Sequence, residues 1–414
     1  MAILKPFQGV RPRKDLAAAI AALPYDVYSR EEAREEVKDK PLSFLRIDRA
    51  ETFFPPDQDM YADEVYGKAR EALYGMLESG EFIQDSEDSF YIYRLTMDGR
   101  PQTGLVACTS IDDYLEGRIK KHELTRESKE QDRIRHVDAC NANTGPIFLA
   151  YQAKDAVDGL VEGWMGAHGA EYDITTEDGV RHQVWRIGDR ETNSRLVELF
   201  AAVPSLYIAD GHHRAASAVK VGQKRRLENP GYTGKEEFNY FLSVLFPDNQ
   251  LKILDYNRVV KDLNGMDKGA FLEAVKGKFL VEKESGQAIR PVEKATFGMF
   301  LDGTWYLLRA KEGIARSENP VEALDVSILQ NHLLAPVLGI QDPRTDERID
   351  FVGGIRGLEE LERRVRKDMA VAFAMVPTGI DELMSIADAG ALMPPKSTWF
   401  EPKLRSGLFI HLLA

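Results

Sequence analysis

Five consecutive residues, Asp210-Gly211-His212-His213-Arg214, have the types that bind and handle phosphate. They follow the apolar run Ser205–Ala209 and precede an alanine-rich run with good helix propensity. The first turn of a helix carries N–H groups without helical partners, and its dipole favours an anion there. We therefore predict that Gly211, His212 and Arg214 bind a phosphate or nucleotide, with Asp210 and His213 as catalytic groups.

The same pentad also has a purely structural interpretation. Asp210 has the type of a good N-cap, and a capped helix with exposed histidines would need no ligand. Two adjacent histidines and an arginine, however, lower helix propensity without any gain in packing. This cost favours the anion site.

A second concentration of charged groups lies in the segment Arg118–Arg133. Its candidate phosphate ligands are Lys120, Lys121 and Arg126, and its candidate catalytic pair is His122 and Glu123. A solvated helix face is the alternative for such a run. Because phosphoryl transfer must neutralise several negative charges, we predict that Lys120–Arg126 joins the pocket at Gly211 across a cleft.

Other segments offer further candidate site residues. Small polar residues in His136–Pro146 are typical of a binding loop, with Asn141 and Thr144 as candidate substrate ligands. Ser29 and Glu32 have the spacing of a capping box, which leaves Tyr25 and Asp26 for a site. We include Asp26 among the substrate ligands.

A second possible anion nest lies at Gly353-Gly354, before the expected helix Arg356–Asp368. The alternative there is a simple strand–turn–helix connection.

The elements that must position these groups alternate between helix and strand signals. Helices are expected at Asp59–Glu78, Asp189–Ala202, His212–Glu228, Glu322–Leu334 and Arg356–Asp368. Strands are expected at Ser89–Thr96, Gln102–Ser110, Ser205–Ala209, Tyr240–Pro247 and Met369–Val376. Asp-Gly pairs at 98–99, 178–179 and 302–303 predict type I′ hairpins. The pattern favours an α+β fold, and no GxGxxG or GxxxxGK[ST] motif supports a dinucleotide site or a P-loop.

The length of 414 residues is too great for one ordinary core. We expect a phosphate-binding region over residues 1–230, with inserted antiparallel hairpins, and a C-terminal α/β region over 231–414. The break is expected near Pro230-Gly231. The proline-rich stretch Met393–Pro402 predicts an ordered loop over a cleft or an interface.

Composition excludes several classes of protein. A net charge of −13 disfavours non-specific nucleic-acid binding. The only cysteines, Cys108 and Cys140, have no CxxC spacing, so neither a disulfide framework nor a zinc knuckle is expected. No signal-peptide pattern and no apolar run of about 18 residues is present, so the expected location is the cytoplasm, with no membrane partner.

Several motifs together resemble a bacterial family, domain of unknown function 1015. They are Lys5-Pro-Phe, Pro24-Tyr-Asp-Val, Lys121-His-Glu-Leu-Thr, Ala209-Asp-Gly-His-His-Arg and Met393-Pro-Pro-Lys-Ser-Thr. The resemblance extends over nearly the whole chain. It implies a relation to the archaeal free-serine kinase and a ParB/sulfiredoxin-like core, in which a strand–glycine–basic–helix turn cradles nucleotide phosphates.

The resemblance also implies roles for particular residues. Residues 210–214 match the phosphate motif of the serine kinase, which implies Mg²⁺ with ATP or ADP as cofactors. Lys396, from the last motif, is a further candidate substrate ligand. The glutamate base of that kinase has no secure counterpart, and the candidates are Glu123, Glu31, Glu32 and Asp26.

Three functions are consistent with these observations. The first is a nucleotide-dependent phosphotransferase that acts on a small hydroxy amino acid such as serine. The second is dephosphorylation of phosphoserine, and the third is a ParB-like nucleotide-binding module without catalysis. The expected partners are a nucleotide and a small-molecule substrate, with a homo-oligomer as a further possibility.

Overall fold

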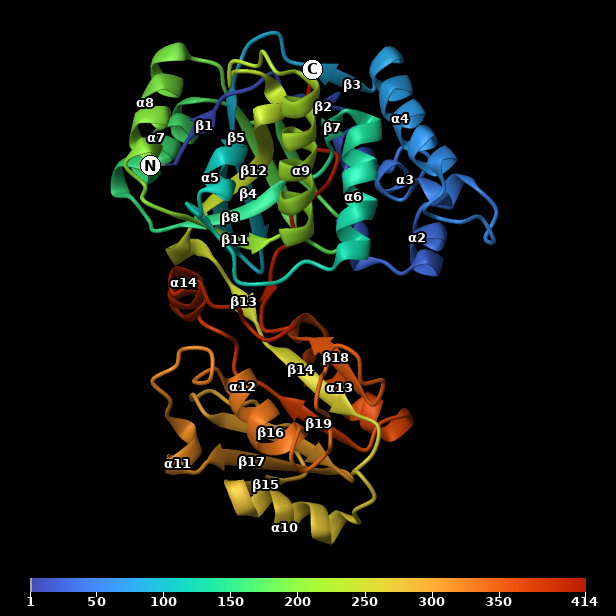
Figure 1. The fold of residues 1–414 in the computed structure, drawn as a ribbon, viewed down its shortest axis with the longest axis vertical. Helices are drawn as coiled ribbons and strands as arrows, with labels where there is room; N and C mark the ends of the chain where they lie inside the picture. Colours follow the sequence, from blue (N-terminus) through green and yellow to red (C-terminus); the bar gives the residue numbers. More distant parts are fainter. Residues whose placement is uncertain (1) are drawn as a thin grey trace. The chain divides into compact units, whose positions relative to one another are not determined.

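The computed structural model describes residues 2–414 and divides into two compact units. One unit comprises Met1–Leu251 with Pro402–Ala414, and the other comprises Lys252–Glu401 (Figure 1). This division differs from the break expected near residue 230. Strand β12 (Tyr240–Pro247) lies inside the first sheet, hydrogen-bonded to β5 on one side and to β8 on the other, so the chain leaves the unit only after it.

A nine-stranded mixed sheet forms the centre of the first unit. Its order is β6-β11-β8-β12-β5-β4-β10-β9, and β1 also pairs with β5. The strands are β1 (Leu4–Lys5), β4 (Phe90–Met97), β5 (Arg100–Ser110), β6 (Ile119–Lys120), β8 (Ile147–Tyr151), β9 (Tyr172–Thr175), β10 (Arg181–Ile187) and β11 (Leu206–Asp210). The β6–β11 and β8–β12 pairs are parallel, and the other pairs are antiparallel. Buried apolar side chains of these strands form the core, among them Ile92, Leu149, Ile208 and Phe241.

Helices pack around this sheet and, over residues 17–78, in a second apolar cluster beside it, and α6 lies against α9 (Figure 1). They are α1 (Ala17–Ile20), α2 (Arg30–Glu36), α3 (Leu45–Asp48), α4 (Asp63–Glu78), α5 (Ile111–Leu115), α6 (Glu127–Cys140), α7 (Asp155–Ala167), α8 (Arg190–Ala201) and α9 (His212–Glu228). Helix α9 has the expected bounds. Its buried Ala215, Ala216 and Ala218 are small, which allows close packing.

Two short strand pairs tie the ends of the chain into the first unit. Strand β2 (Val10–Pro12) pairs with β3 (Phe82–Gln84), and β7 (Ala142–Asn143) pairs with β21 (His411–Leu412). The C-terminal segment from Pro402 onward therefore belongs to the unit that holds the candidate site residues 120–126 and 210–214.

The second unit contains a six-stranded antiparallel sheet in the order β15-β17-β16-β19-β14-β18. Its strands are β14 (Tyr256–Val260), β15 (Phe279–Ser285), β16 (Thr296–Leu301), β17 (Thr304–Ala310), β18 (Ile349–Gly353) and β19 (Val371–Ala374), beside the pair β13 (Ile253–Leu254) and β20 (Trp399–Phe400). Its helices are α10 (Lys268–Lys278), α11 (Glu312–Ala315), α12 (Asp325–Leu329), α13 (Gly357–Lys367) and α14 (Ile380–Asp388). The mixed helix and sheet content agrees with the expected class. The ParB/sulfiredoxin-like core stays a prediction.

Local signals placed several of these elements, with some differences. Asp98-Gly99 and Asp302-Gly303 have positive φ at both positions, as a type I′ turn requires. The third hairpin forms, but only Gly179 is left-handed, because its wider turn closes with Thr176 N donating to the Val180 carbonyl. The long helix expected at Glu322–Leu334 instead begins at Asp325 and ends in a π turn over Gln330–Leu334, and α4 begins at Asp63 rather than Asp59. No helix among residues 2–414 is long and apolar enough to cross a membrane.

Candidate phosphate-binding site

The corner between β11 and α9 has the expected strand–glycine–helix form. Gly211 adopts φ 92° and serves as the N-cap of α9 without any side-chain cap. Asp210 does not cap the helix, so the purely structural interpretation of the pentad does not hold. One Asp210 carboxylate oxygen accepts from Gly211 N at 2.8 Å, and the other lies 3.2 Å from Lys403 Nζ. The N–H groups of the first turn are therefore left for an outside acceptor.

Asp210 is held in its ionised form. Burial opposes ionisation, but the charges of Lys403 and Arg214, together with the Gly211 N–H, lower the pKa of Asp210 well below its ordinary value. This carboxylate is therefore a fixed negative charge beside the start of α9.

Arg214 folds back over the corner. Its Nη1 donates to the Pro146 carbonyl. A Cβ atom added to Gly211 would lie 3.1 Å from Arg214 Nε, and one added to Gly145 would lie 3.6 Å from Nη1. The two glycines thus let the guanidinium lie close to the backbone, which places a cation at the helix start.

Two buried imidazoles and a carboxylate meet beside this corner. The rings of His122 and His212 contact edge to face, with centroids 4.5 Å apart, and they are only 2% and 6% exposed. Glu123 Oε2 lies 3.7 Å from His212 Nδ1. Burial lowers the pKa of His122 to about 4, and burial together with His122 lowers that of His212 well below its usual range, so both rings are neutral at pH 7.

Strand pairing, and not a cleft, brings the start of segment 120–126 beside the strand that ends at Asp210. Strand β6 pairs directly with β11, with Lys120 opposite Tyr207, so the chain runs on from the sheet edge to His122 and Glu123. Lys121 Nζ lies 4.5 Å from the centre of the Tyr114 ring. The charge of Lys121 also lowers the pKa of His212, although burial and His122 contribute more. Arg126 is the exposed N-cap of α6.

His213 faces a different set of groups. Burial lowers its pKa first, the charge of Lys129 lowers it further, and the charge of Asp26 opposes these effects. The charge of Asp26 therefore reaches the first turn of α9. Its neighbour Tyr25 lies under Arg133, whose guanidinium carbon is 4.1 Å from the ring centre.

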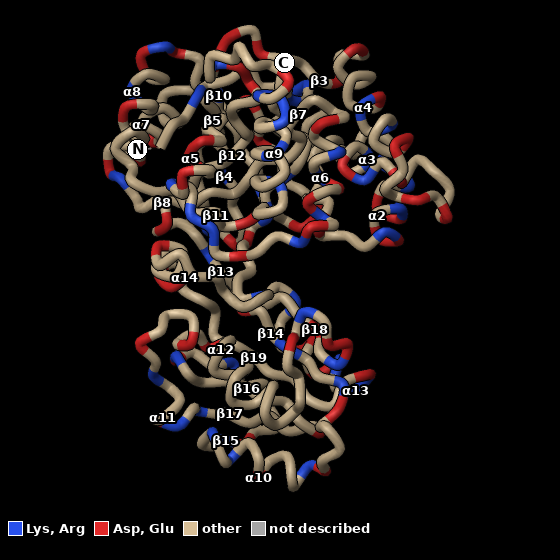
Figure 2. The backbone as a smooth tube through the Cα atoms, viewed as in Figure 1, with Lys and Arg blue, Asp and Glu red and all other residues tan. Residues whose placement is uncertain are grey.

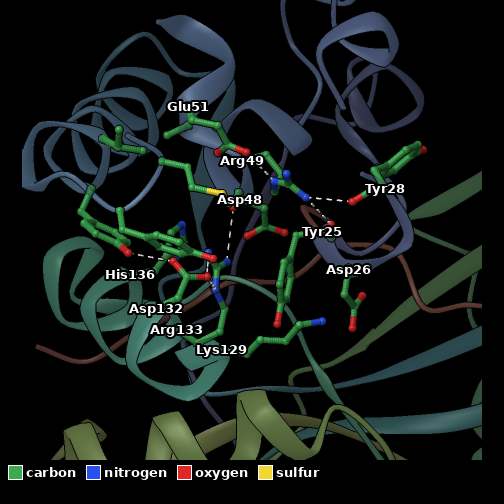
Figure 3. A pocket seen from close by; sticks show the side chains of 15 residues that line it. Tyr25, Asp26, Tyr28, Asp48, Arg49, Glu51, Lys129, Asp132, Arg133 and His136 are labelled. Atoms are coloured by element: carbon green, nitrogen blue, oxygen red, sulfur yellow. Dashed lines mark hydrogen bonds and ion pairs between the residues drawn. The ribbon is translucent and has the colours of Figure 1, made fainter. Parts of the chain in front are cut away.

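A cavity of about 120 Å³ opens between the 25–26 segment and the first turns of α6. Figure 3 shows Tyr25 and Asp26 on one side and Lys129, Asp132 and Arg133 on the other. The lining carries both signs of charge, as does the surface around α2, α3 and α6 (Figure 2). The members with ionised or polar ends include Asp26, Asp48, Arg49, Glu51, Lys129, Asp132 and Arg133.

Lys129, Asp132 and Arg133 were missed as ligands by the sequence analysis. The signal was present, because residues three and four apart on the helix over 127–140 lie on one face. Asp48 gave no such signal.

Two predicted substrate ligands near the end of α6 have different positions. The Thr144 hydroxyl donates to Asp48 Oδ1 at 2.9 Å, and Thr144 lines a smaller adjoining cavity with Arg214 and Arg133. Asn141 adopts φ 50° as the C-cap of α6, at the opposite end of that helix from Lys129, and it lines neither cavity. Asparagine tolerates this left-handed backbone, and the role of Asn141 as a substrate ligand stays a prediction.

Three other predicted residues line neither cavity. Lys396 belongs to the second unit, where its ammonium group faces the Tyr256 ring at 5.4 Å, and its role as a substrate ligand stays a prediction. Glu31 and Glu32 are exposed on α2. Glu32 completes the capping box predicted with Ser29, because it accepts from Ser29 N at 2.8 Å.

Several solved structures are similar to this chain. A free serine kinase variant in complex with AMP shares 14% identity and a TM-score of 0.35, covering 73% of this chain and 92% of that one. SbnI with a C-terminal truncation, from Staphylococcus aureus, shares 11% identity and a TM-score of 0.39, covering 74% and 87%. A conserved hypothetical protein from Pyrococcus furiosus shares 16% identity and a TM-score of 0.35, covering 73% and 95%.

No curated protein matches the chain. Residues 4–327 match the family described as "Protein of unknown function (DUF1015)", in agreement with the resemblance of the sequence motifs. The chain therefore belongs to the DUF1015 family.

Proposed function

We propose that this protein is a nucleotide-dependent phosphotransferase that acts on a small hydroxy amino acid such as serine. The observation that carries the proposal is the uncapped start of α9, where Gly211 is left-handed and Arg214 lies over the corner. Backbone N–H groups, a helix dipole and a guanidinium together suit phosphate oxygens.

The surrounding cations suit a ligand with several negative charges. Lys129 and Arg126 both affect the pKa of His213, after burial, and Lys121 affects that of His212. Phosphoryl transfer depends chiefly on positioning and on electrostatic stabilisation. A nucleotide phosphate at residues 211–214 would meet these groups together.

The cavity beside Tyr25 suits a small zwitterionic substrate. Its volume of about 120 Å³ is well below the roughly 300–1,000 Å³ of pockets for drug-sized ligands. Arg133 and Lys129 offer cations to a carboxylate, and Asp132 offers an anion to an ammonium group. An amino acid bound there would present its hydroxyl toward the start of α9.

We assign the general base to Asp26. It lines the cavity, and its charge acts on His213 at the start of α9. Glu123, the first candidate from the sequence, instead contacts His212 and lines neither cavity. A base must reach the proton that it accepts, which favours Asp26.

Mg²⁺ is the cofactor implied by the family resemblance. Magnesium prefers oxygen ligands, usually one or two carboxylates plus substrate phosphates. The ionised Asp210, at the end of β11, fits this requirement. When bound, Mg²⁺ would neutralise charge on the transferred phosphoryl group.

The test is phosphorylation of a panel of hydroxy amino acids with ATP or ADP and Mg²⁺, followed by phosphorus NMR. We expect a phosphorylated amino acid that depends on nucleotide. In Asp26→Asn, turnover should fall by about 10²–10⁴, the usual contribution of a general base, with little loss of nucleotide affinity.

Glu31→Gln is the matched control, because this exposed carboxylate on the neighbouring helix lines neither cavity. Free phosphate released from phosphoserine without nucleotide would point instead to a phosphatase. Nucleotide binding without any product would point to a non-catalytic module. Unchanged turnover in Asp26→Asn, with a loss in Glu123→Gln, would return the base to Glu123.

A further inference from the structure

His122, Glu123 and His212 converge on one point, and the proposed phosphotransfer does not use them directly. One potential ligand atom from each lies within 4.8 Å of the others. The two histidines come from segments far apart in the chain, the stretch after β6 and the first residue of α9, which the β6–β11 pairing brings together.

Burial of the imidazoles is costly unless something binds them. His122 Nδ1 and His212 Nε2 are buried and have no hydrogen-bond partner among residues 2–414. A buried polar atom without a partner costs about 1–3 kcal/mol, and native structures contain few of them. The unpartnered His122 Nδ1, in a ring that contacts a second buried imidazole, indicates a ligand that accepts the lone pair of an imidazole nitrogen.

We propose that His122, Glu123 and His212 form a binding site for a divalent transition-metal ion, Zn²⁺ or Mn²⁺. Two imidazoles and one carboxylate are a recurrent catalytic set, which leaves a further coordination position open. Ligand atoms about 2.1 Å from a tetrahedral ion lie roughly 3.4 Å apart. The 3.7 Å between Glu123 Oε2 and His212 Nδ1 is close to this spacing, so Nδ1 is the His212 ligand atom in this arrangement, and the ligand atoms of all three residues lie within 4.8 Å of one another.

The set discriminates against Mg²⁺, because that ion prefers oxygen ligands in octahedral geometry. The proposed site is therefore distinct from the Asp210 carboxylate that suits nucleotide-bound Mg²⁺. The two proposals stand separately, since metal binding is measured without nucleotide or amino acid.

The charges around His122, Glu123 and His212 affect the affinity of the site for the metal ion. The helix dipole of α9 and the cations Lys121 and Arg214 oppose a positive ion, whereas Glu123 and Asp210 favour one. A phosphate in the open position would shift this balance toward the ion. We therefore expect inorganic phosphate to raise the affinity for the metal.

The experiment is calorimetric titration of the full-length, chelator-treated protein with Zn²⁺, Mn²⁺ and Mg²⁺, each with and without inorganic phosphate in an amount that keeps the metal soluble. We expect one Zn²⁺ or Mn²⁺ per chain and much weaker Mg²⁺ binding. Loss of a residue behind a metal ligand costs about 10–100-fold in affinity. Loss of a direct ligand in His122→Ala, His212→Ala or Glu123→Gln should therefore cost roughly 100-fold or more.

Glu123→Gln guards against a folding artefact, because this side chain is half-exposed and the substitution keeps its shape. Circular dichroism checks the two histidine variants. His168→Ala, an exposed histidine stacked on Trp164 of the same unit, is the matched control and should bind metal as the wild type does. Absence of Zn²⁺ and Mn²⁺ binding, or binding unchanged in folded Glu123→Gln and His212→Ala, would overturn the site.

Discussion

Two corners of this molecule join a strand to a helix through glycine, and only one of them suits a phosphate. In the first unit, β11 ends at Asp210, Gly211 is left-handed, and the first turn of α9 contains no acidic residue. In the second unit, β18 ends at Gly353, and a short turn at Gly354–Arg356 leads into α13, whose first turn contains Glu359 and Glu360.

The second corner is already filled by carboxylates of the chain. A Cβ atom added to Gly354 would lie 2.4 Å from Asp255 Oδ1, and Gly354 N donates to the Asp255 carbonyl. The second anion nest considered at Gly353-Gly354 is thus a strand–turn–helix connection with its own acidic groups. A glycine before a helix makes an anion site only where the chain leaves the helix start uncapped and supplies cations.

The strongest test of this comparison removes the cation at the first corner. Arg214→Ala should weaken ADP binding by about 1.5–3 kcal/mol, roughly 10- to 150-fold, the contribution of a hydrogen bond to a charged group. Titration calorimetry measures the change. Arg356→Ala is the matched variant at the second corner and should leave ADP affinity unchanged. Equal losses in the two variants would contradict the distinction between the corners.

Buried carboxylates of the two units differ in a related way. Asp210 is kept ionised by Lys403 and Arg214, whereas burial raises the pKa of Asp325 to about 6. Asp325 Oδ1 accepts from Ala295 N, but its other oxygen has no hydrogen-bond partner among the described residues. The ionised form of Asp325 therefore destabilises the fold above pH 6, and the loss is recovered as the pH falls toward the unfolded value of 3.8.

Asp325→Asn should accordingly stabilise the protein at pH 7. The shift in pKa, which already includes the attraction of Lys294 3.8 Å away, corresponds to at most about 3 kcal/mol, and we expect about 1–2 because the polar amide of asparagine is also buried at a cost. Urea denaturation at pH 7 and pH 4 measures the free energy of unfolding. The gain should largely vanish at pH 4, and an equal gain at both pH values would show that ionisation is not its cause.

A third helix start gives the smallest expected effect. At α2 the chain itself satisfies the N-terminus, because Ser29 and Glu32 form a reciprocal capping box. Ser29→Ala should lower the free energy of unfolding by about 1 kcal/mol. Nucleotide affinity should stay as in the wild type, and any loss of ADP binding would mean that α2 contributes to the site. Thermal unfolding and calorimetry together separate the two effects.

The sequence by itself determined the elements whose signals are local. The apolar run before Asp210, the break at Gly211 and the helix to Glu228 were all predicted, since propensity and glycine conformation act within a few residues. The capping box at Ser29 was predicted for the same reason. Three type I′ turns were also predicted, and two of them have the expected conformation. The alternative in which Asp210 caps the helix is not realised, because Gly211 N and Lys403, from the C-terminal segment, bind its carboxylate.

Only the tertiary structure decided which of these groups meet. The contact of His122 with His212 depends on β6 pairing with β11, and the cavity needs Asp48 and Tyr25 beside Arg133 of α6. Such contacts join residues far apart in the chain, and they form because burying the apolar faces of sheet and helices fixes the packing. The position of Asn141, at the end of α6 and outside the lining of the cavity, was likewise not evident from its neighbours in the sequence.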